Sequence, residues 1–271
     1  MFYMLSNDRA KIAVYDLQPQ GRKTIVLVHG WPLSHRMFEY QIPALLENDY
    51  RIISLDLRGF GESEETSQGY DYSQLATDLY SVIYQLQLNH FTLVGFSMGG
   101  AIVTKYMGLY RGYGVQKLCL WDAALPSYGK SRNNPYGQTR EDTQKLIELG
   151  YRDRPALNQY FGSIFFAKKP SEPFENWLQN ISNNASGVGE METLKSLRDE
   201  DVFTDMTSIY VPTGIFHGRQ DKICPFEMAK IMQKNIPNAQ LFPFDNAGHG
   251  AFYEAKETFT PTFIRFIENT R

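Results

Sequence analysis

The alternation of short apolar runs with longer amphipathic segments constrains the fold of this chain more than any other feature of its sequence. The apolar runs, rich in β-branched residues and leucine, are typical of buried parallel strands. We expect strands over residues 12–17, 24–28, 51–55, 91–94, 116–121, 213–217 and 240–244. The segments between them carry apolar residues three or four positions apart, and the helices expected from this spacing span 36–46, 73–86, 99–110, 226–233 and 254–268. This order predicts an α/β fold, in which a mostly parallel twisted sheet is flanked by helices.

The strand pattern stops between residues 123 and 210, where four helical segments replace it. We expect these helices over 138–149, 155–166, 173–181 and 190–197. Gly150 follows the first, Asp153 precedes the second and Ser171 precedes the third, as capping residues do. We therefore predict that residues 123–210 form a helical lid inserted into a core made of residues 1–122 and 211–271. Within the insertion, residues 182–189 are expected to be a flexible linker.

Composition excludes several classes of protein. The net charge of −3 and the absence of any Lys/Arg block leave no basic surface for a nucleic acid. The longest uncharged stretch, 91–104, is interrupted by glycines and is shorter than the roughly 20 residues that span a bilayer, so no membrane association is expected. The first residues turn polar too early for a secretory signal, and two cysteines are too few for a disulfide framework. A cytoplasmic location is expected, and a homo-oligomer is left open.

The segment from Gly95 to Gly99 lies where an expected buried strand ends and an expected helix begins. A serine on such a sharp turn presents its hydroxyl above the edge of the sheet. The residues two before and two after it must be small, because strand and helix pass close together. A purely structural turn is the alternative. We expect Ser97 to be a catalytic nucleophile.

The segment His29-Gly30-Trp31-Pro32 directly follows the expected strand 24–28, so its backbone lies at the same sheet edge as Ser97. A tetrahedral intermediate needs two fixed N–H donors, and the N–H groups of Trp31 and Met98 are the natural pair. That of Met98 lies at the positive end of the helix after Ser97. Pro32 has no N–H and is expected to shape the loop. The alternative is a turn without a catalytic role.

Five histidines compete for the role of general base. His249 lies on a loop of small residues, 246–250, between the last expected strand and the last helix, exposed and flexible enough to reach Ser97. We expect His249 to be the base. The others are expected to bind loop backbone or to lie at caps and on the surface: His29, His35, His90 and His217.

The acid that orients the histidine has three candidates. Asp221 follows the expected strand 213–217, where a carboxylate can hold the imidazole tautomer and stabilise the imidazolium. Asp122 ends the strand 116–121, and Asp245 lies only four residues before His249. We rank Asp221 first and Asp122 second.

Other conspicuous residues are interpreted as structural. The loop 56–63 is rich in charges, but its glycines indicate a tight turn that an Asp56–Arg58 pair can brace. Cys119 lies in an apolar strand and Cys224 has no basic neighbour to activate it, so both are expected to be inert. Neither a metal nor an organic cofactor is expected.

The motifs at residues 29–33, 56–63, 95–100, 211–225 and 248–249 together resemble the cofactor-free haloperoxidase and arylesterase (non-heme chloroperoxidase-like) branch of the α/β-hydrolase superfamily. The resemblance implies an α/β-hydrolase fold with a helical lid inserted after the sixth strand. It also implies the triad Ser97, Asp221 and His249, with Trp31 and Met98 as oxyanion donors. The insertion carries no motif of its own, so the resemblance does not identify the substrate. Members with proline after the oxyanion tryptophan are often assayed as perhydrolases, so Pro32 implies peracid formation as a side activity.

The predicted function is hydrolysis of a small carboxylic ester through an acyl-enzyme on Ser97. The alternatives are a carbon–carbon bond hydrolase, in which Arg132 or Arg140 would hold a substrate carboxylate, and a small-molecule receptor built on a hydrolase fold. Hydrolases of this fold that need aspartate at the nucleophile position are disfavoured, because that position is Ser97. Nine aromatic residues in the insertion are expected in part to roof the site and to favour short acyl groups: Tyr128, Tyr136, Tyr151, Tyr160, Phe161, Phe165, Phe166, Phe174 and Trp177.

Overall fold

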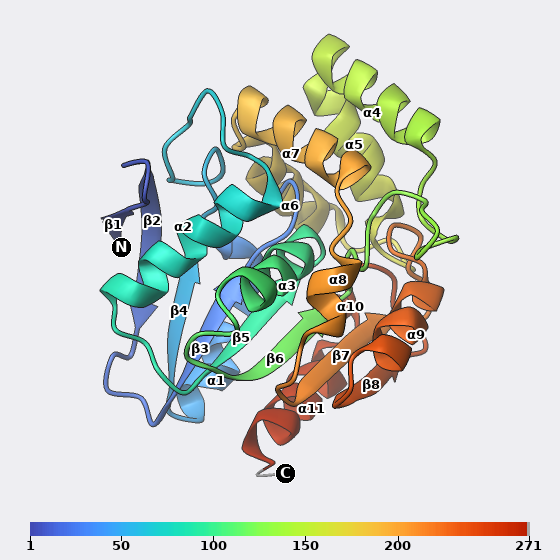
Figure 1. The fold of residues 1–271 in the computed structure, drawn as a ribbon. Coiled ribbons are helices and arrows are strands. Elements are labelled where there is room, and N and C mark those ends of the chain that lie inside the picture. The colour runs from blue at the N-terminus through green and yellow to red at the C-terminus, as the bar shows by residue number, and fades with distance from the viewer. Residues whose placement is uncertain (270–271) are drawn as a thin grey trace.

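The computed structural model describes residues 1–269, in which one eight-stranded sheet is covered by helices on both faces (Figure 1). The strands are β1 (Phe2–Leu5), β2 (Lys11–Leu17), β3 (Lys23–Val28), β4 (Tyr50–Leu55), β5 (Phe91–Phe96), β6 (Val115–Trp121), β7 (Thr213–Gly218) and β8 (Ala239–Phe244). Their order is β1-β2-β4-β3-β5-β6-β7-β8, and only the pairings β1–β2 and β2–β4 are antiparallel. The predicted α/β class and the mostly parallel sheet are confirmed.

The central strands are the most deeply buried, which is why their sequences are nearly continuous apolar runs. All six residues of β5 are buried, for example, and so are five of the six in β4. The sequence analysis missed β1, an edge strand whose apolar run is only four residues long and whose residues are mostly exposed. With β1 counted, the insertion follows the sixth strand, β6.

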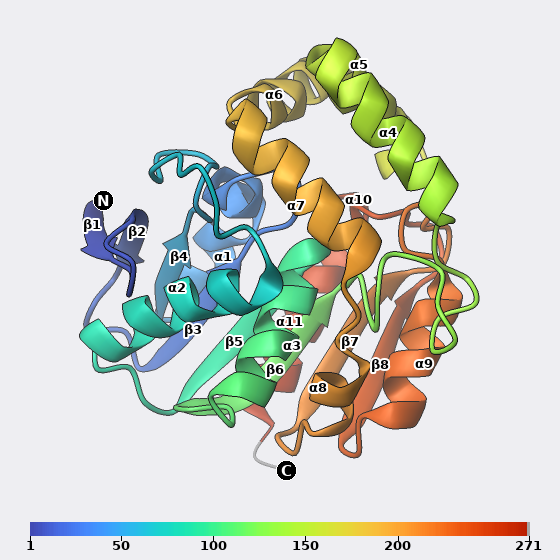
Figure 2. The same cartoon turned by 45° about the horizontal axis from the view of Figure 1, so that its top comes forward.

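Helices cover both faces of the sheet (Figures 1 and 2). One face carries α2 (Tyr72–Gln85), α3 (Met98–Leu109), α8 (Phe203–Thr207) and α9 (Phe226–Asn235), and the other carries α1 (Ile42–Glu47) and α11 (Lys256–Glu268). The short helix α10 (Ala251–Glu254) precedes α11. The helix expected over 36–46 is instead a 3₁₀ helix, η1 (His35–Tyr40), followed by α1, because Pro43 lacks the N–H that a continuous helix would need.

The insertion contains no strand of the sheet and consists mainly of four long helices. They are α4 (Arg140–Arg152), α5 (Arg154–Phe165), α6 (Glu172–Asn183) and α7 (Gly187–Asp199). Figure 2 shows them together beyond one end of the sheet. The linker expected over 182–189 is wrong: only three residues separate α6 from α7, and the Ser186 hydroxyl caps α7 by accepting the Gly189 N–H at 2.9 Å. The short helix α8 was also missed.

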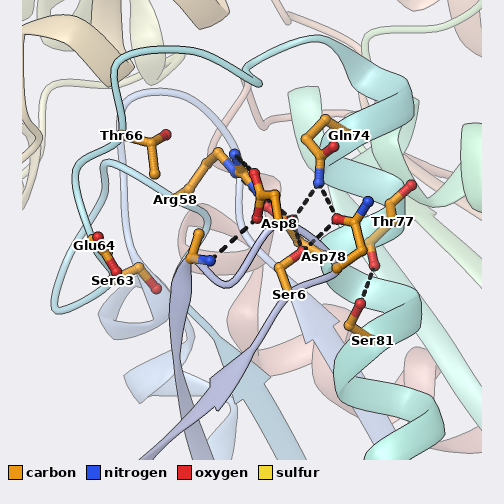
Figure 3. Close-up of polar contacts among 12 residues, drawn as sticks. Ser6, Asp8, Arg58, Ser63, Glu64, Thr66, Gln74, Thr77, Asp78 and Ser81 are labelled. Atoms are coloured by element: carbon orange, nitrogen blue, oxygen red, sulfur yellow. Dashed lines mark hydrogen bonds and ion pairs between the residues drawn. The ribbon is translucent and has the colours of Figure 1, made fainter.

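The predicted Asp56–Arg58 pair is wrong. Arg58 is fully buried and donates instead to Asp78 on α2, at 2.7 and 2.6 Å, and to Asp8 at 2.8 and 3.1 Å (Figure 3). Asp56 accepts from the backbone N–H and the ring of His35, both at 2.8 Å. A buried guanidinium needs a carboxylate that is buried beside it, and Asp78 supplies it. The network ties the amino-terminal hairpin to α2.

Within residues 1–269, no helix combines the length and the apolar character needed to cross a membrane.

Candidate active site

Three loops at the carboxyl ends of β5, β7 and β8 bring Ser97, Asp221 and His249 together. His249 Nε2 lies 2.9 Å from Ser97 Oγ, and His249 Nδ1 lies 2.8 Å from Asp221 Oδ2. All three side chains are buried. The three residues that the sequence singled out therefore form one hydrogen-bonded line.

The backbone at Ser97 has the geometry that a nucleophile on a sharp turn requires. Ser97 has φ 52° and ψ −120°, a conformation that L-residues rarely adopt. A Cβ at Gly95 would overlap the carbonyl oxygen of Gly99, and one at Gly99 would overlap the carbonyl of Val28. The expectation that small residues must flank the serine is confirmed, because strand and helix leave no room for a side chain.

His249 is fully buried, whereas the sequence analysis expected it on an exposed, flexible loop. Phe96 and two residues of α5 surround its ring: the ring centroids of Phe96, Phe165 and Phe161 lie 5.0, 5.1 and 6.3 Å from that of the imidazole. The insertion thus covers the histidine directly. Such apolar walls keep water from the imidazole and strengthen its charge interactions.

Asp221 is held in place by backbone donors as well as by histidine. Its Oδ1 accepts the N–H groups of Ile223 at 2.8 Å and Cys224 at 2.9 Å, and its Oδ2 also lies 3.4 Å from His217 Nε2. Burial alone would raise the pKa of Asp221, but the charge of His249 and the hydrogen bonds from both histidines outweigh it and hold the pKa below its ordinary value. The carboxylate is therefore ionised wherever the protein is folded near neutral pH.

The two rival acids lie in different surroundings. Asp122 accepts the Gly218 N–H at 2.8 Å, and burial, with the nearby charge of Asp221, raises its pKa well above the ordinary value. Its second oxygen has no hydrogen-bond partner within residues 1–269. Asp245 is exposed and pairs with Arg219 at 2.6 Å. Within residues 1–269, Asp221 is the only one of the three acids that contacts the ring of His249.

The backbone groups expected to stabilise an oxyanion lie beside Ser97. Met98 is the first residue of α3, and Trp31 lies on the loop that follows β3. The Ser97 N–H donates to the Trp121 carbonyl at 2.9 Å, whereas neither the Trp31 nor the Met98 N–H has a hydrogen-bond partner in the described chain. Two N–H groups thus remain free to bind a ligand oxygen.

His29 fixes the loop that carries Trp31. Its Nδ1 donates to the Gly30 carbonyl at 2.9 Å, and its Nε2 accepts the Leu57 N–H at 3.0 Å. Burial lowers the pKa of His29 to about 4, so the ring is neutral at pH 7. The structural role expected for this histidine agrees with these contacts.

Similarity to known proteins shows the family of this chain. The model of the alpha/beta hydrolase fold family matches residues 23–256. The chain belongs to the α/β-hydrolase family. It is 43% identical to an AB hydrolase superfamily protein of Bacillus subtilis, YisY, over 97% of this chain and 98% of the relative. A putative non-heme chloroperoxidase of Synechocystis is 34% identical over 96% of each chain. The structure of an esterase (EaEST) from Exiguobacterium antarcticum superposes with a TM-score of 0.97, at 41% identity over 99% of each chain.

The hydrolase has a small enclosed cavity beside Ser97. Its volume of about 10 Å³ is near the least that holds one water molecule. It is lined by Trp31, Ser97, Tyr128, Leu146, Phe161, Leu194, Leu197 and Ile223. The sequence analysis anticipated the two aromatic residues of the insertion but missed the three leucines of α4 and α7. Their helical spacing marks them as buried and does not tell which partner they face.

Several residues that the sequence placed near the site lie elsewhere in the hydrolase. Tyr136, Tyr151 and Tyr160 are about half exposed or more, at 52%, 63% and 48%, and line no part of this cavity. Arg140 pairs with Asp199 on the surface, and Arg132 is exposed and does not line the cavity either. No cation of the described chain therefore lines the cavity beside Ser97 to hold a substrate carboxylate.

Two sets of buried side chains of the hydrolase bring three ligand-type atoms within 4.8 Å of one another in the described residues: Asp221, Cys224 and His249, and Asp122, His217 and Asp221. Burial raises the pKa of the Cys224 thiol well above its ordinary value, which makes it a poor ligand. Both nitrogens of His249 and both oxygens of Asp221 already take part in hydrogen bonds. These donors fit a hydrogen-bonded relay better than a metal ion.

Proposed function

We propose that this hydrolase cleaves small carboxylic esters, with Ser97 as nucleophile, His249 as general base and acid, and Asp221 as the residue that orients His249. The observation that carries the proposal is the buried line of hydrogen bonds from Ser97 Oγ through His249 to Asp221, at 2.9 and 2.8 Å. Similarity to an esterase of solved structure supports the same reaction class.

In the proposed mechanism, His249 Nε2 takes the proton of Ser97 as its oxygen attacks the ester carbonyl. The ionised Asp221 holds the Nδ1–H tautomer and stabilises the imidazolium that forms. The N–H groups of Trp31 and Met98 bind the negative oxygen of the tetrahedral intermediate. His249 then protonates the leaving alcohol, and a water molecule repeats the sequence to release the acid and restore Ser97.

The cavity beside Ser97 favours short acyl groups. Its walls are leucine, isoleucine and aromatic side chains from the insertion and the core, and it has room for about one water molecule. Each further methylene gains about 0.8 kcal/mol from burial, whereas forcing packed side chains apart costs about 1–3 kcal/mol. An acetyl or propionyl group is therefore accommodated more easily than a long chain.

Perhydrolysis follows from the same acyl-enzyme when hydrogen peroxide replaces water. The peroxide oxygen attacks the acyl carbon, Ser97 leaves with its proton restored by His249, and a peracid forms. The peracid then oxidises bromide to hypobromite and returns to the carboxylic acid. The similarity to a putative non-heme chloroperoxidase and the proline after Trp31 support this side activity.

A substrate screen tests the proposal. Purified enzyme is assayed on simple esters, lactones, thioesters and diketones, with the Ser97→Ala variant as the blank. We expect multiple turnovers on aryl acetates and none on diketones. Stoichiometric binding without turnover would indicate a receptor, and diketone cleavage alone would indicate a carbon–carbon bond hydrolase.

A further inference from the structure

A second and much larger cavity lies between α5 and α6 of the insertion. Its volume is about 590 Å³, and Leu33, two residues after Trp31, forms part of its wall. Phe161 lines both this α5–α6 cavity and the small cavity beside Ser97. The two cavities therefore meet at Phe161, and the larger one is of ligand size.

The wall of the α5–α6 cavity is rich in carboxamides: Asn158, Gln159, Asn176, Gln179 and Asn183. Three of them form a hydrogen-bonded chain, because Asn183 Oδ1 accepts from Asn158 Nδ2 at 3.1 Å and from Gln179 Nε2 at 3.2 Å. Asn158 is only 2% exposed, yet its Oδ1 has no partner in the described residues. A buried acceptor without a partner is costly, and a ligand hydroxyl would satisfy this oxygen once the Asn158 side chain rotates toward the cavity that it lines.

The charged side chains of this wall already have partners within the protein. Lys169 and Glu175 pair with each other at 3.4 Å, and Asp153 accepts the Ala156 N–H at the start of α5. Carboxamides donate and accept with equal ease, so they suit a neutral ligand with several hydroxyl groups. The remaining wall includes the rings of Phe165 and Phe166, apolar surfaces on which the C–H face of a sugar ring can pack.

We propose that the α5–α6 cavity binds the alcohol part of the ester and that this alcohol is polyhydroxylated, a sugar or sugar alcohol. The inference rests on the proposed esterase function. The acyl carbonyl lies at Ser97 and the sugar lies between α5 and α6, with the Phe161 ring turned aside to let the ester linkage pass. After attack by Ser97, the bond between the acyl carbon and the sugar oxygen breaks as His249 protonates that oxygen, and the free sugar leaves through the cavity.

Two acetate esters that share a six-membered ring in the alcohol part test the proposal. Methyl 6-O-acetyl-α-glucopyranoside carries the hydroxyls, and cyclohexylmethyl acetate lacks them. We expect kcat/KM to be at least about tenfold higher for the sugar ester, because each matched hydroxyl contributes one hydrogen bond. Methyl acetate, whose alcohol is too small to reach the cavity, serves as the reference substrate.

Gly162 offers a way to fill the cavity without disturbing the backbone. It lines the cavity, and a Cβ placed on it would meet only Gln179 Oε1, at 3.7 Å. Gly162→Leu should lower the ratio of kcat/KM for the sugar ester to that for methyl acetate at least about tenfold. Asn158→Leu should lower the same ratio mainly through a higher KM. Gly187→Leu is the matched control, because Gly187 lies on another helix with nothing within 4 Å of its Cβ position.

The outcomes separate the two claims. Suppose that methyl acetate and cyclohexylmethyl acetate are hydrolysed, but the sugar ester has no advantage or Gly162→Leu leaves the kcat/KM ratio unchanged. Either result would overturn the sugar site and leave the esterase function intact. If no ester is hydrolysed, the proposed function fails. The sugar site is then decided by binding: methyl α-glucopyranoside should raise the melting temperature of the wild type and of Gly187→Leu but not that of Gly162→Leu.

Discussion

Protonation of His29 is expected to destabilise the loop that carries Trp31 and to make the fold sensitive to mild acid. The ring is fully buried and accepts the Leu57 N–H on Nε2, an atom that cannot accept once it is protonated. Burial lowers the pKa of His29 from an ordinary value of 6.5 to about 4. The unfolded chain therefore binds this proton at a pH where the folded chain does not.

The sign and size of the effect follow from proton linkage. Between pH 6.5 and about 4 the unfolded state binds more protons, so the free energy of unfolding falls as the pH falls through this window. Below it both states are protonated and the contribution stays constant. From about pH 7.5 to about pH 5, the loss attributable to His29 is roughly 2 kcal/mol.

Urea unfolding of the wild type and of His29→Asn at both pH values measures this loss. The variant lacks a titrating group at this position, so its free energy of unfolding should fall by roughly 2 kcal/mol less than that of the wild type over the same interval. His90→Asn is the matched control, since His90 is exposed. An equal loss of stability in acid for the wild type and His29→Asn would refute the reasoning. If the variant does not fold, an NMR titration of the His29 ring in the wild type shows whether its pKa is lowered.

Three further predictions concern the active site. Asp221→Asn should lower kcat on phenyl acetate by about 10³–10⁴-fold, and Asp122→Asn by less than about tenfold; the reverse ranking would move the acid to the end of β6. Across aryl esters, kcat/KM should peak from acetate to butyrate, fall at least about tenfold by octanoate and show no jump where substrate forms micelles, whereas a rise through palmitate would mean an open groove. With acetate, hydrogen peroxide and bromide, the enzyme should brominate a phenolic dye at a rate that EDTA leaves unchanged, and bromination by Ser97→Ala would rule out the acyl-enzyme route.

Much of the sheet could be predicted because buried parallel strands are nearly continuous apolar runs. The seven expected strands all occur, with ends shifted by at most two residues. The edge strand β1 was missed because its apolar run, Phe2–Leu5, is only four residues long and its side chains are mostly exposed. The break between η1 and α1 was predictable from Pro43, and the amphipathic pattern obscured it.

The active site could be partly predicted from the sequence for a related reason. In a parallel sheet the residues that follow strands meet at one edge, so Ser97, Asp221 and His249 could be placed near one another from chain position alone. The partners of Arg58 could not, because Asp78 and Asp8 are 20 and 50 residues away in sequence. The burial of His249 under α5 was equally hidden, since helical spacing does not tell which surface the insertion covers.

The covalent intermediate tests the central claim most directly. Mass spectrometry of the enzyme quenched during turnover of phenyl acetate should find one acetyl group on the peptide that contains Ser97. Ser97→Ala should carry none there and should lose at least about 10⁴-fold in kcat. An acetyl group on another residue, or a Ser97→Ala variant that keeps turning over the ester, would contradict the account.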